Sequence, residues 1–463
     1  MRLPALALLL CLPACAEEGM WTFDNLPVKA LQARWGLTPT QAWVDHLRLA
    51  SLRFPGGSGS FVSPEGLVLT NHHVVRGAIQ SLSTRDRDLL KDGFVAMQRD
   101  QELKVPGMEL MQLVRMEDIT ARVAAAAKAA PTPAEALRAR EREVAAARQE
   151  LSRATDLTVE PVTLYQGGET WLYVYRKFRD VRLVLAPELA VARFGGDHDN
   201  FTYPRHHLDF ALLRVYEDGK PFRPEHRLAW SRKGFQPGAP SFITGHPGTT
   251  NRLWTVAQMD FAREVGMPQD IAGRQRLRAA LEAYAARSFE HRARVGGRIY
   301  GLDNGLKAMG GYLATLQDGA AMAPVADRER RLRDRVKADP ALAREVGGSW
   351  EAITKALAAQ RRLAREQAMV TTRHSELLGT ALHVLRLPAE RSLPEARRLS
   401  EYAEGALPAL LKRLTAPRPT PFHADLEVHL LAFGLQEAAD QLGTQHPFVK
   451  AMLGGRPPEE VAR

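Results

Sequence analysis

Cysteine is almost absent from this chain. Of its 463 residues only two are cysteines, Cys11 and Cys15, so the sequence that follows them can form no disulfide. Beyond the N-terminal stretch there is also no apolar run of the roughly 20 residues that a helix needs to cross a bilayer. A composition of 45% hydrophobic and 25% charged residues instead predicts a globular chain with ample material for a packed core.

Motifs for metal and nucleic-acid binding are missing as well. The sequence contains no His-x-x-Glu-His and no cysteine-rich spacing, so we expect no metal and no cofactor. The net charge of +10 comes largely from arginines on Ala-rich helices, such as Arg328–Arg333. Without zinc-finger spacing or RNA-recognition aromatics, this charge predicts solvated helix faces and no nucleic-acid partner.

The N-terminus has the pattern of an export signal. Met1–Arg2 precedes the apolar stretch Leu3–Pro13, and Ala14–Ala16 provides a small-x-small cleavage site. Residues 1–16 are therefore predicted to be a signal peptide, removed after Ala16, which places the protein in the periplasm or outside the cell. Alternatively, Leu12–Cys15 is a lipoprotein box and Cys15 carries a lipid anchor.

The rest of the chain divides into two parts with different sequence patterns. Residues 17–257 are rich in strand patterns, interrupted by a helical insertion over 117–155, where Thr132 and Glu135 form a capping box. Residues 258–463 are Ala/Leu/Arg-rich at helical spacing. Prolines are predicted to divide that second part into separate helices: Pro340, Pro388, Pro408, Pro417 and Pro419.

Strands are predicted wherever apolar residues alternate or cluster between turn signals. A hairpin is expected from Phe61–Val62 and Leu67–Thr70 around the turn Ser63–Gly66. Further expected strands follow: Thr158–Val162, Thr170–Tyr175, Val181–Leu185, Asp209–Val215 and several within 228–256.

Two of these strands each lead to, or begin with, one residue that could act in catalysis. His73 comes just after the hairpin, and Asp209 opens a later apolar strand. A serine hydrolase needs such a pair, because an imidazole takes the proton of the nucleophile and a carboxylate fixes its tautomer. The order His then Asp is that of chymotrypsin-like proteases. His72 is expected to point away from His73, since alternate residues of an extended chain face opposite sides.

The nucleophile that should complete the pair is missing from the sequence. Ser58, within Gly57–Gly59, precedes His73 and belongs to the strand that leads to it. Ser349 follows two glycines and is predicted to cap a helix. No serine after Asp209 lies in a Gly-x-Ser-Gly segment, and these serines are Ser231, Ser241, Ser288, Ser349, Ser375, Ser392 and Ser400.

Longer motifs accompany the pair. They are Gly19–Trp21, Leu69–His73, Gly77–Gln80, Asp180–Pro187, Phe194–Asn200, Tyr203–His206 and Gly245–Arg252. With them the chain resembles the bacterial dipeptidyl-peptidase 7 and 11 family of serine exopeptidases, from Glu18 into the helical region.

The resemblance implies an α+β multidomain fold. A chymotrypsin-like β-barrel region, with its second barrel incomplete here, would be followed by a truncated α-helical cap domain, and family members are typically homodimers. His73 would be the general base and Asp209 its partner. Asn200 and Phe201 would hold the free α-amino group of a peptide substrate. The family usually has Trp at Phe201.

Three functional hypotheses follow. The first is a serine dipeptidyl-peptidase that releases dipeptides from peptide N-termini, in which this chain lacks the segment with the nucleophile. The second is a non-catalytic relic or peptide-binding module. The third, disfavoured by the helical region after 258, is an HtrA-like endopeptidase. We expect no turnover by the 463-residue chain alone.

Overall fold

The computed structural model describes most of the chain, in two compact units. The described residues are 19–84, 86–193, 201, 206–234, 236, 238–370, 374–404, 406–416 and 422–463. The sheet unit comprises residues up to Met116, Tyr173–Glu188 and Phe210–Leu253, and the helical unit comprises Glu117–Leu172, Leu189–Asp209 and Trp254–Arg463. The expected signal peptide and Asn200 lie outside the described residues.

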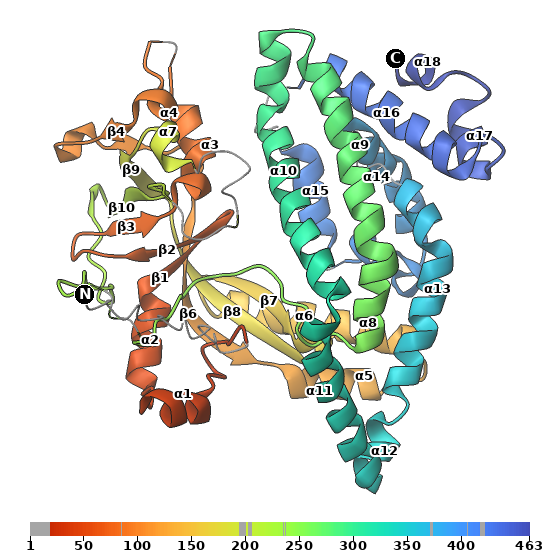
Figure 1. Ribbon diagram of the computed structural model, residues 1–463, viewed down its shortest axis with the longest axis horizontal. Coiled ribbons are helices and arrows are strands. Elements are labelled where there is room, and N and C mark those ends of the chain that lie inside the picture. The colour runs from red at the N-terminus through yellow and green to blue at the C-terminus, as the bar shows by residue number, and fades with distance from the viewer. Residues whose placement is uncertain are drawn as a thin grey trace, which may run out of the picture. The chain divides into compact units, whose positions relative to one another are not determined.

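The strands form one antiparallel sheet that is open (Figure 1). The strands are β1 (Ser51–Phe54), β2 (Gly57–Phe61), β3 (Leu67–Thr70), β4 (Phe94–Val95), β5 (Leu103–Lys104), β6 (Leu110–Asp118), β7 (Thr158–Leu164), β8 (Glu169–Phe178), β9 (Asp180–Ala186), β10 (Ala211–Glu217) and β11 (Lys220–Pro221). Their order is β4-β9-β10-β3-β2-β1-β6-β8-β7, with β11 beside β10 and β5 beside β9. Among the described residues β4 and β7 do not pair, so the sheet is not closed and the β-barrel that the resemblance implies is not confirmed.

The predicted hairpin is confirmed as β2 and β3. Phe61 lies opposite Val68, and both side chains are fully buried. The Ser63 hydroxyl accepts hydrogen bonds from the backbone N–H groups of Glu65 and Leu67, which fixes the tight turn between the strands. Alternate residues of β3, Val68 and Thr70, therefore face the core, and a local side-chain bond fixes the turn that sets the register.

The helices among the described residues of the sheet unit are α1 (Val28–Trp35), α2 (Gln41–Ala50), α3 (His72–Leu82) and α4 (Leu89–Asp92). Val75 and Ile79 of α3 belong to one apolar cluster with buried strand residues such as Leu52 and Leu213. The N-terminus of α2 is capped by Thr40, whose hydroxyl accepts from the N–H of Trp43 at 3.2 Å. Val44 and Ala50 are the buried residues of this helix.

The strands expected within 228–256 are not formed. None of the described residues between Phe222 and Trp254 is in a strand, and large apolar side chains there are exposed, including Ile243 at 102% and Trp230 at 65%. A buried extended chain satisfies its backbone polar groups mainly by pairing with another strand, whereas an exposed one can bond to water and stay unpaired. The alternation of apolar residues therefore predicted strands within 228–256, but the described residues there pair with no other strand.

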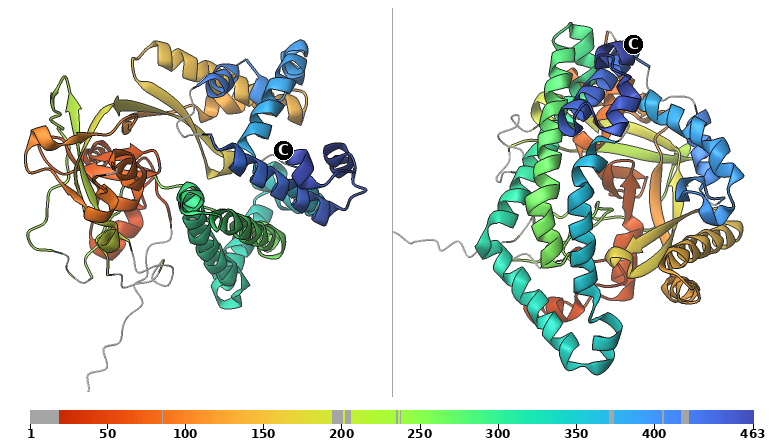
Figure 2. Two further views of the ribbon diagram at one scale, coloured as in Figure 1. Left: turned by 90° about the horizontal axis from the view of Figure 1, so that it is seen from above. Right: turned by 90° about the vertical axis from the view of Figure 1, so that its right-hand side faces the viewer.

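The helical unit contains the insertion that the sequence predicts. Its helices are α5 (Thr120–Lys128), α6 (Pro133–Arg153), α7 (Leu189–Ala192), α8 (Val256–Phe261), α9 (Met267–Ala285), α10 (Phe289–Gln317), α11 (Gly319–Ala338), α12 (Pro340–Val346), α13 (Ser349–Met369), α14 (Glu376–Ser392), α15 (Leu407–Thr415), α16 (Ala424–Leu442), α17 (Pro447–Leu453) and α18 (Pro458–Ala462). Figure 2 shows α5 and α6 as a helical hairpin. Thr132 caps α6 through the N–H of Glu135, as predicted.

Long helices pack side by side in this unit. Figure 1 shows α9 beside α10, and their contact is sealed by Leu281, Tyr284 and Ile299, with Leu430 of α16 packed against them. Within the described residues, no helix is both long enough and apolar enough to cross a membrane.

Two sequence predictions about helix ends were wrong. Pro388 does not divide helices but lies inside α14, where only the four residues to Ser392 follow it. The helix therefore continues through the proline, although the ring removes one backbone hydrogen bond and crowds the carbonyl four residues before it. Ser349 is the first residue of α13, and Gly348 is its N-cap.

Candidate active site

His73 occupies the first turn of α3, directly after β3 (Leu67–Thr70). The expectation of an extended chain at His72 and His73 was wrong, because both are helical. Successive helix residues are rotated by about 100°, so the two imidazoles still diverge. His72 is buried at 1% exposure, whereas His73 is exposed. The histidine predicted to act as a base is therefore the accessible one.

The pairing of β3 with β10 relates the positions of the two predicted residues. Thr70, the last residue of β3, lies opposite Ala211, the first residue of β10. His73 comes three residues after Thr70, and Asp209 comes two residues before Ala211. Along the chain, the proposed base and the proposed acid therefore flank the same paired end of two adjacent strands.

The end of β3 is held firmly against β2. The hydroxyl of Thr70, which is only 6% exposed, donates to the carbonyl of Ser58 at 2.8 Å. A Cβ at Gly57 would lie 2.5 Å from a methyl group of Val74, so only glycine allows this close approach. These contacts fix the backbone on both sides of His73, which suits a residue whose position matters for chemistry.

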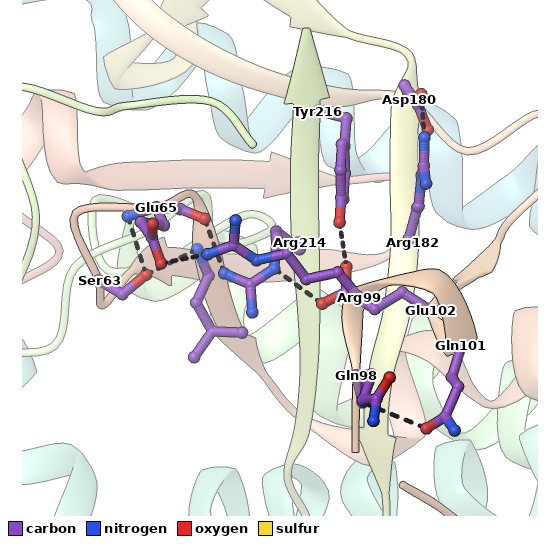
Figure 3. A network of polar contacts seen from close by, with 11 residues as sticks. Ser63, Glu65, Gln98, Arg99, Gln101, Glu102, Asp180, Arg182, Arg214 and Tyr216 are labelled. Atoms are coloured by element: carbon purple, nitrogen blue, oxygen red, sulfur yellow. Dashed lines mark hydrogen bonds and ion pairs between the residues drawn. The ribbon is translucent and has the colours of Figure 1, made fainter. Parts of the chain in front are cut away.

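A polar network supports β10 from its other end (Figure 3). The Arg214 guanidinium contacts the Glu102 carboxylate at 2.9 Å and donates to the carbonyl of Glu65 at 2.8 Å. The Tyr216 hydroxyl donates to the second Glu102 oxygen at 2.8 Å. This network ties β10 to the turn between β2 and β3 and to the segment before β5.

The centre of this network is well buried. The side chains of Glu102 and Arg214 are 3% and 13% exposed. Burial and the bond to Glu102 raise the pKa of Tyr216, so its hydroxyl remains a donor at neutral pH. Arg182 stacks over the Tyr216 ring at 3.8 Å and pairs with Asp180 at 3.0 Å. Each charged member of the network has a partner, so no buried charge is left with an uncompensated desolvation cost. The network therefore stabilises the pairing register of β9 and β10.

His246 is a half-buried residue of the sheet unit that lies near Ser58. Its backbone N–H donates to the Ser58 hydroxyl at 2.7 Å, and its ring lies 6.0 Å from that of Tyr175. Neither ring nitrogen has a hydrogen-bond partner among the described residues. Burial, together with the positive charge of Arg53, lowers the pKa of His246 to about 4. This imidazole is therefore neutral at neutral pH.

The residues predicted to bind substrate are only partly described. Phe201 is 55% exposed and has a φ of 58°, a left-handed conformation that a bulky side chain rarely adopts. Asn200 lies outside the described residues. Asp209 is half-buried, and the backbone just before it is anchored by the N–H of Leu208, which donates to the carbonyl of Val191 at 2.9 Å.

The serines after Asp209 that the structure describes have structural positions. Ser288 and Ser375 cap the N-termini of α10 and α14. Ser392 ends α14 and donates to the carbonyl of Ala389. Ser231 and Ser241 lie in the exposed segment after β11. None of these described residues sits on a strand-to-helix turn of the kind that presents a nucleophile.

Sequence reasoning missed the supports of the candidate site. Glu102 and Arg214 are 112 residues apart and form a pair only because β10 crosses the segment before β5. Arg214 gave no signal of its own in the sequence, because it alternates with the buried Leu213 and Val215 as an ordinary polar-face residue of β10 would. His246 had a signal of its own in the motif Gly245–Arg252.

Several curated proteins are similar to this chain. The dipeptidyl-peptidase 7 of Porphyromonas endodontalis is 35% identical over 261 residues, 52% of this chain and 32% of that protein. The dipeptidyl-peptidase 7 of Capnocytophaga gingivalis is 32% identical over 65% of this chain and 45% of its own length. The Asp/Glu-specific dipeptidyl-peptidase of Shewanella putrefaciens is 29% identical over 89% of this chain and 58% of its own length. The chain therefore spans between a third and three-fifths of these relatives.

A solved structure has the same fold. Porphyromonas endodontalis DPP11 in complex with the dipeptide Arg-Glu superposes with a TM-score of 0.72 at 22% identity, covering 96% of this chain and 67% of that one. The sequence model of the peptidase S46 family matches residues 16–463, which is nearly the whole chain. The chain belongs to the peptidase S46 family.

Proposed function

We propose that this chain forms the N-terminal part of a serine-type dipeptidyl-peptidase, in which His73 is the general base and Asp209 orients it. The observation that carries the proposal is the register of Thr70 opposite Ala211, which relates both residues to one end of a strand pair. In the complete enzyme a serine would attack the second peptide carbonyl. His73 would take the serine proton and then give it to the leaving amine, while Asp209 would stabilise the imidazolium.

Dipeptide release, as opposed to cleavage inside a chain, is proposed from the family resemblance, which assigns the free α-amino group of the substrate to Asn200 and Phe201. Phe201 has an exposed ring and a left-handed backbone, a conformation that costs about 1–3 kcal/mol and is found in binding loops. In the proposed enzyme Phe201 forms an apolar wall and Asn200 accepts from the free α-ammonium of the substrate. Two of the relatives are named dipeptidyl-peptidase 7, which agrees with this reading.

The nucleophile is proposed to lie outside this sequence. The relatives are longer than the chain, and none of the serines that the structure describes after Asp209 has a nucleophile's setting. The segment 228–256, which carries strand patterns without strands, would pair with strands of the same outlying part. The S46 match replaces the HtrA-like alternative.

The catalytic assignment is tested in a full-length homologue, at the positions that match this chain. We expect His73→Ala and Asp209→Asn each to lower kcat by roughly 10³-fold or more, because the base or its orienting partner is removed. His206→Gln is the matched control, since His206 is exposed and lies three residues from Asp209; it should leave kcat within about twofold. Near-normal turnover of either catalytic variant would rule the assignment out.

Assays of the 463-residue chain separate the enzyme from the binding module. With dipeptidyl fluorogenic amides we expect no turnover by the chain alone. Turnover would place the nucleophile within it. Saturable binding of peptides with a free N-terminus, lost on acetylation of that N-terminus, would favour a peptide-binding module as the role of the isolated chain.

The cellular setting is proposed from the N-terminus alone. Cleavage after Ala16, or lipidation of Cys15, would deliver the protein to the periplasm or the outside of the cell, where peptides are its substrates. We further propose a homodimer for the complete protein. N-terminal sequencing of the exported protein distinguishes cleavage after Ala16 from a blocked Cys15.

A further inference from the structure

Two histidines far apart in sequence face each other in the sheet unit. His46 lies on α2, and His226 lies in the loop after β11. Their Nδ1 atoms are 3.2 Å apart, and their ring centres are 5.4 Å apart with an interplanar angle of 66°. Both residues are half-buried. Neither histidine belongs to the candidate active site or to a motif that the sequence analysis identified.

Both histidines are held by anchored backbone. Arg48, on the same helix as His46, donates to the carbonyl of Leu113 at 2.7 Å, which fixes α2 to β6. Two residues after His226, the N–H of Leu228 donates to the carbonyl of Phe61 at 2.8 Å, which fixes the loop to β2. The two imidazoles therefore meet because of the fold, and their approach needs no further ordering of the chain.

The distance between the two nitrogens suits a bidentate metal site. In the metal-free state the Nδ1–H of one imidazole donates to the Nδ1 lone pair of the other, so the two nitrogens share one proton. A tetrahedral zinc ion at about 2.0–2.1 Å from each nitrogen would hold them about 3.3 Å apart, close to the observed separation. Exchange of the proton for a metal ion then requires rotation of the rings and little backbone movement.

One acidic residue lies beside the pair. Asp45, next to His46 on α2, accepts a hydrogen bond from Arg48 at 2.8 Å. No cluster of three or more His, Cys, Asp or Glu in metal-binding geometry occurs among the described residues, so water would complete the coordination sphere.

We propose that His46 and His226 form a binding site for a divalent transition-metal ion of the nickel, copper and zinc class, which clasps α2 to the loop after β11. Imidazole nitrogen is a preferred ligand of these ions, and two ligands from one rigid unit give an exchangeable site. The ion would cross-link residues 180 positions apart and stabilise the sheet unit by mass action.

The test is a titration of the untagged 463-residue chain with ZnCl2 by isothermal calorimetry at pH 7.5. We expect one site to be weakened at least tenfold in both His46→Gln and His226→Gln. His423→Gln, which removes an imidazole from the helical unit, is the matched control and should keep the site. An affinity that is unchanged in either of the two variants would overturn the paired site.

A second measurement needs no variant and therefore does not depend on how well the variants fold. One equivalent of Cu²⁺ is added to the unmodified chain, and the electron paramagnetic resonance spectrum is recorded. Coupling to two imidazole nitrogens is expected, because copper binds nitrogen ligands most tightly among these ions. Coupling to one imidazole, or to none, would contradict the proposal.

Discussion

The hairpin β2–β3 and the segment 228–253 carry similar strand patterns, but only the first forms strands. In the hairpin, Phe61 and Val68 are fully buried, and both strands have hydrogen-bonded neighbours on each side. In the later segment Ile243 and Trp230 are exposed, and none of its described residues pairs in the sheet. The difference shows that alternation specifies a face, whereas a strand exists only where a partner satisfies its backbone.

The polar residues of the sheet and of the segment 228–253 also differ in how many partners they have. In the sheet, Arg214 and Tyr216 of β10 reach a common partner in Glu102. In the later segment, His246 is held by its backbone bond to Ser58, while its ring nitrogens have no partner among the described residues. One region is stabilised by reciprocal contacts, and the other is attached to it at a few points.

The largest expected effect is in the hairpin core. Phe61 packs edge-on against Phe178 at 5.8 Å between ring centres and lies 5.6 Å from Phe222. Phe61→Ala should lower the free energy of unfolding of the sheet unit by about 3–5 kcal/mol, because it removes buried area and leaves a cavity. Urea unfolding followed by tryptophan fluorescence measures the change. A loss below about 1 kcal/mol would show that this core does not hold the unit together.

The next effect is in the polar network. Arg214→Met keeps the apolar stem but leaves Glu102 buried with Tyr216 as its remaining partner in the network. We expect a loss of about 3 kcal/mol, the low end for breaking a buried ion pair. The double variant Arg214→Met with Glu102→Gln should recover part of it, because no uncompensated charge remains. Additive losses in a double-mutant cycle would contradict the coupling.

The low pKa of His246 predicts that the sheet unit loses stability in acid. The folded state holds this pKa at about 4, against 6.5 for an unperturbed histidine. Between these values the unfolded chain binds a proton that the folded chain does not, so stability falls as pH drops from 6.5 to 4. The total loss is about 3 kcal/mol, from about 1.4 kcal/mol per pKa unit.

A pH series of urea unfolding curves tests this. His246→Phe should remove most of that slope, while His423→Gln in the helical unit should retain it. If the slope between pH 6.5 and 4 is the same in His246→Phe as in the parent chain, the burial of His246 does not control acid sensitivity.

The smallest effect on stability is expected in the exposed segment 228–253. Ile243→Ser changes a side chain that is 102% exposed, so the free energy of unfolding should change by no more than about 0.5 kcal/mol. The same urea experiment applies. A loss comparable to that of Phe61→Ala would mean that the segment is packed as a strand after all.

Much of the local structure could be predicted from the sequence. The turn at Ser63 and the cap at Thr132 each depend on residues within four positions of each other, and both are confirmed. The error at Pro388 has the same local origin, because the sequence shows a proline but not how much helix follows it. The roles of His73 and Asp209 remain predictions.

The sequence by itself determined the family motifs, the buried faces of the strands and the capped helices, because each depends on neighbours along the chain. Only the tertiary structure decided that Thr70 lies opposite Ala211, that Glu102 meets Arg214, and that the open sheet leaves 228–253 without strands. It also decided the meeting of His46 with His226, 180 residues away. These outcomes depend on which distant backbone groups pair, and local pattern carries no information about the partner.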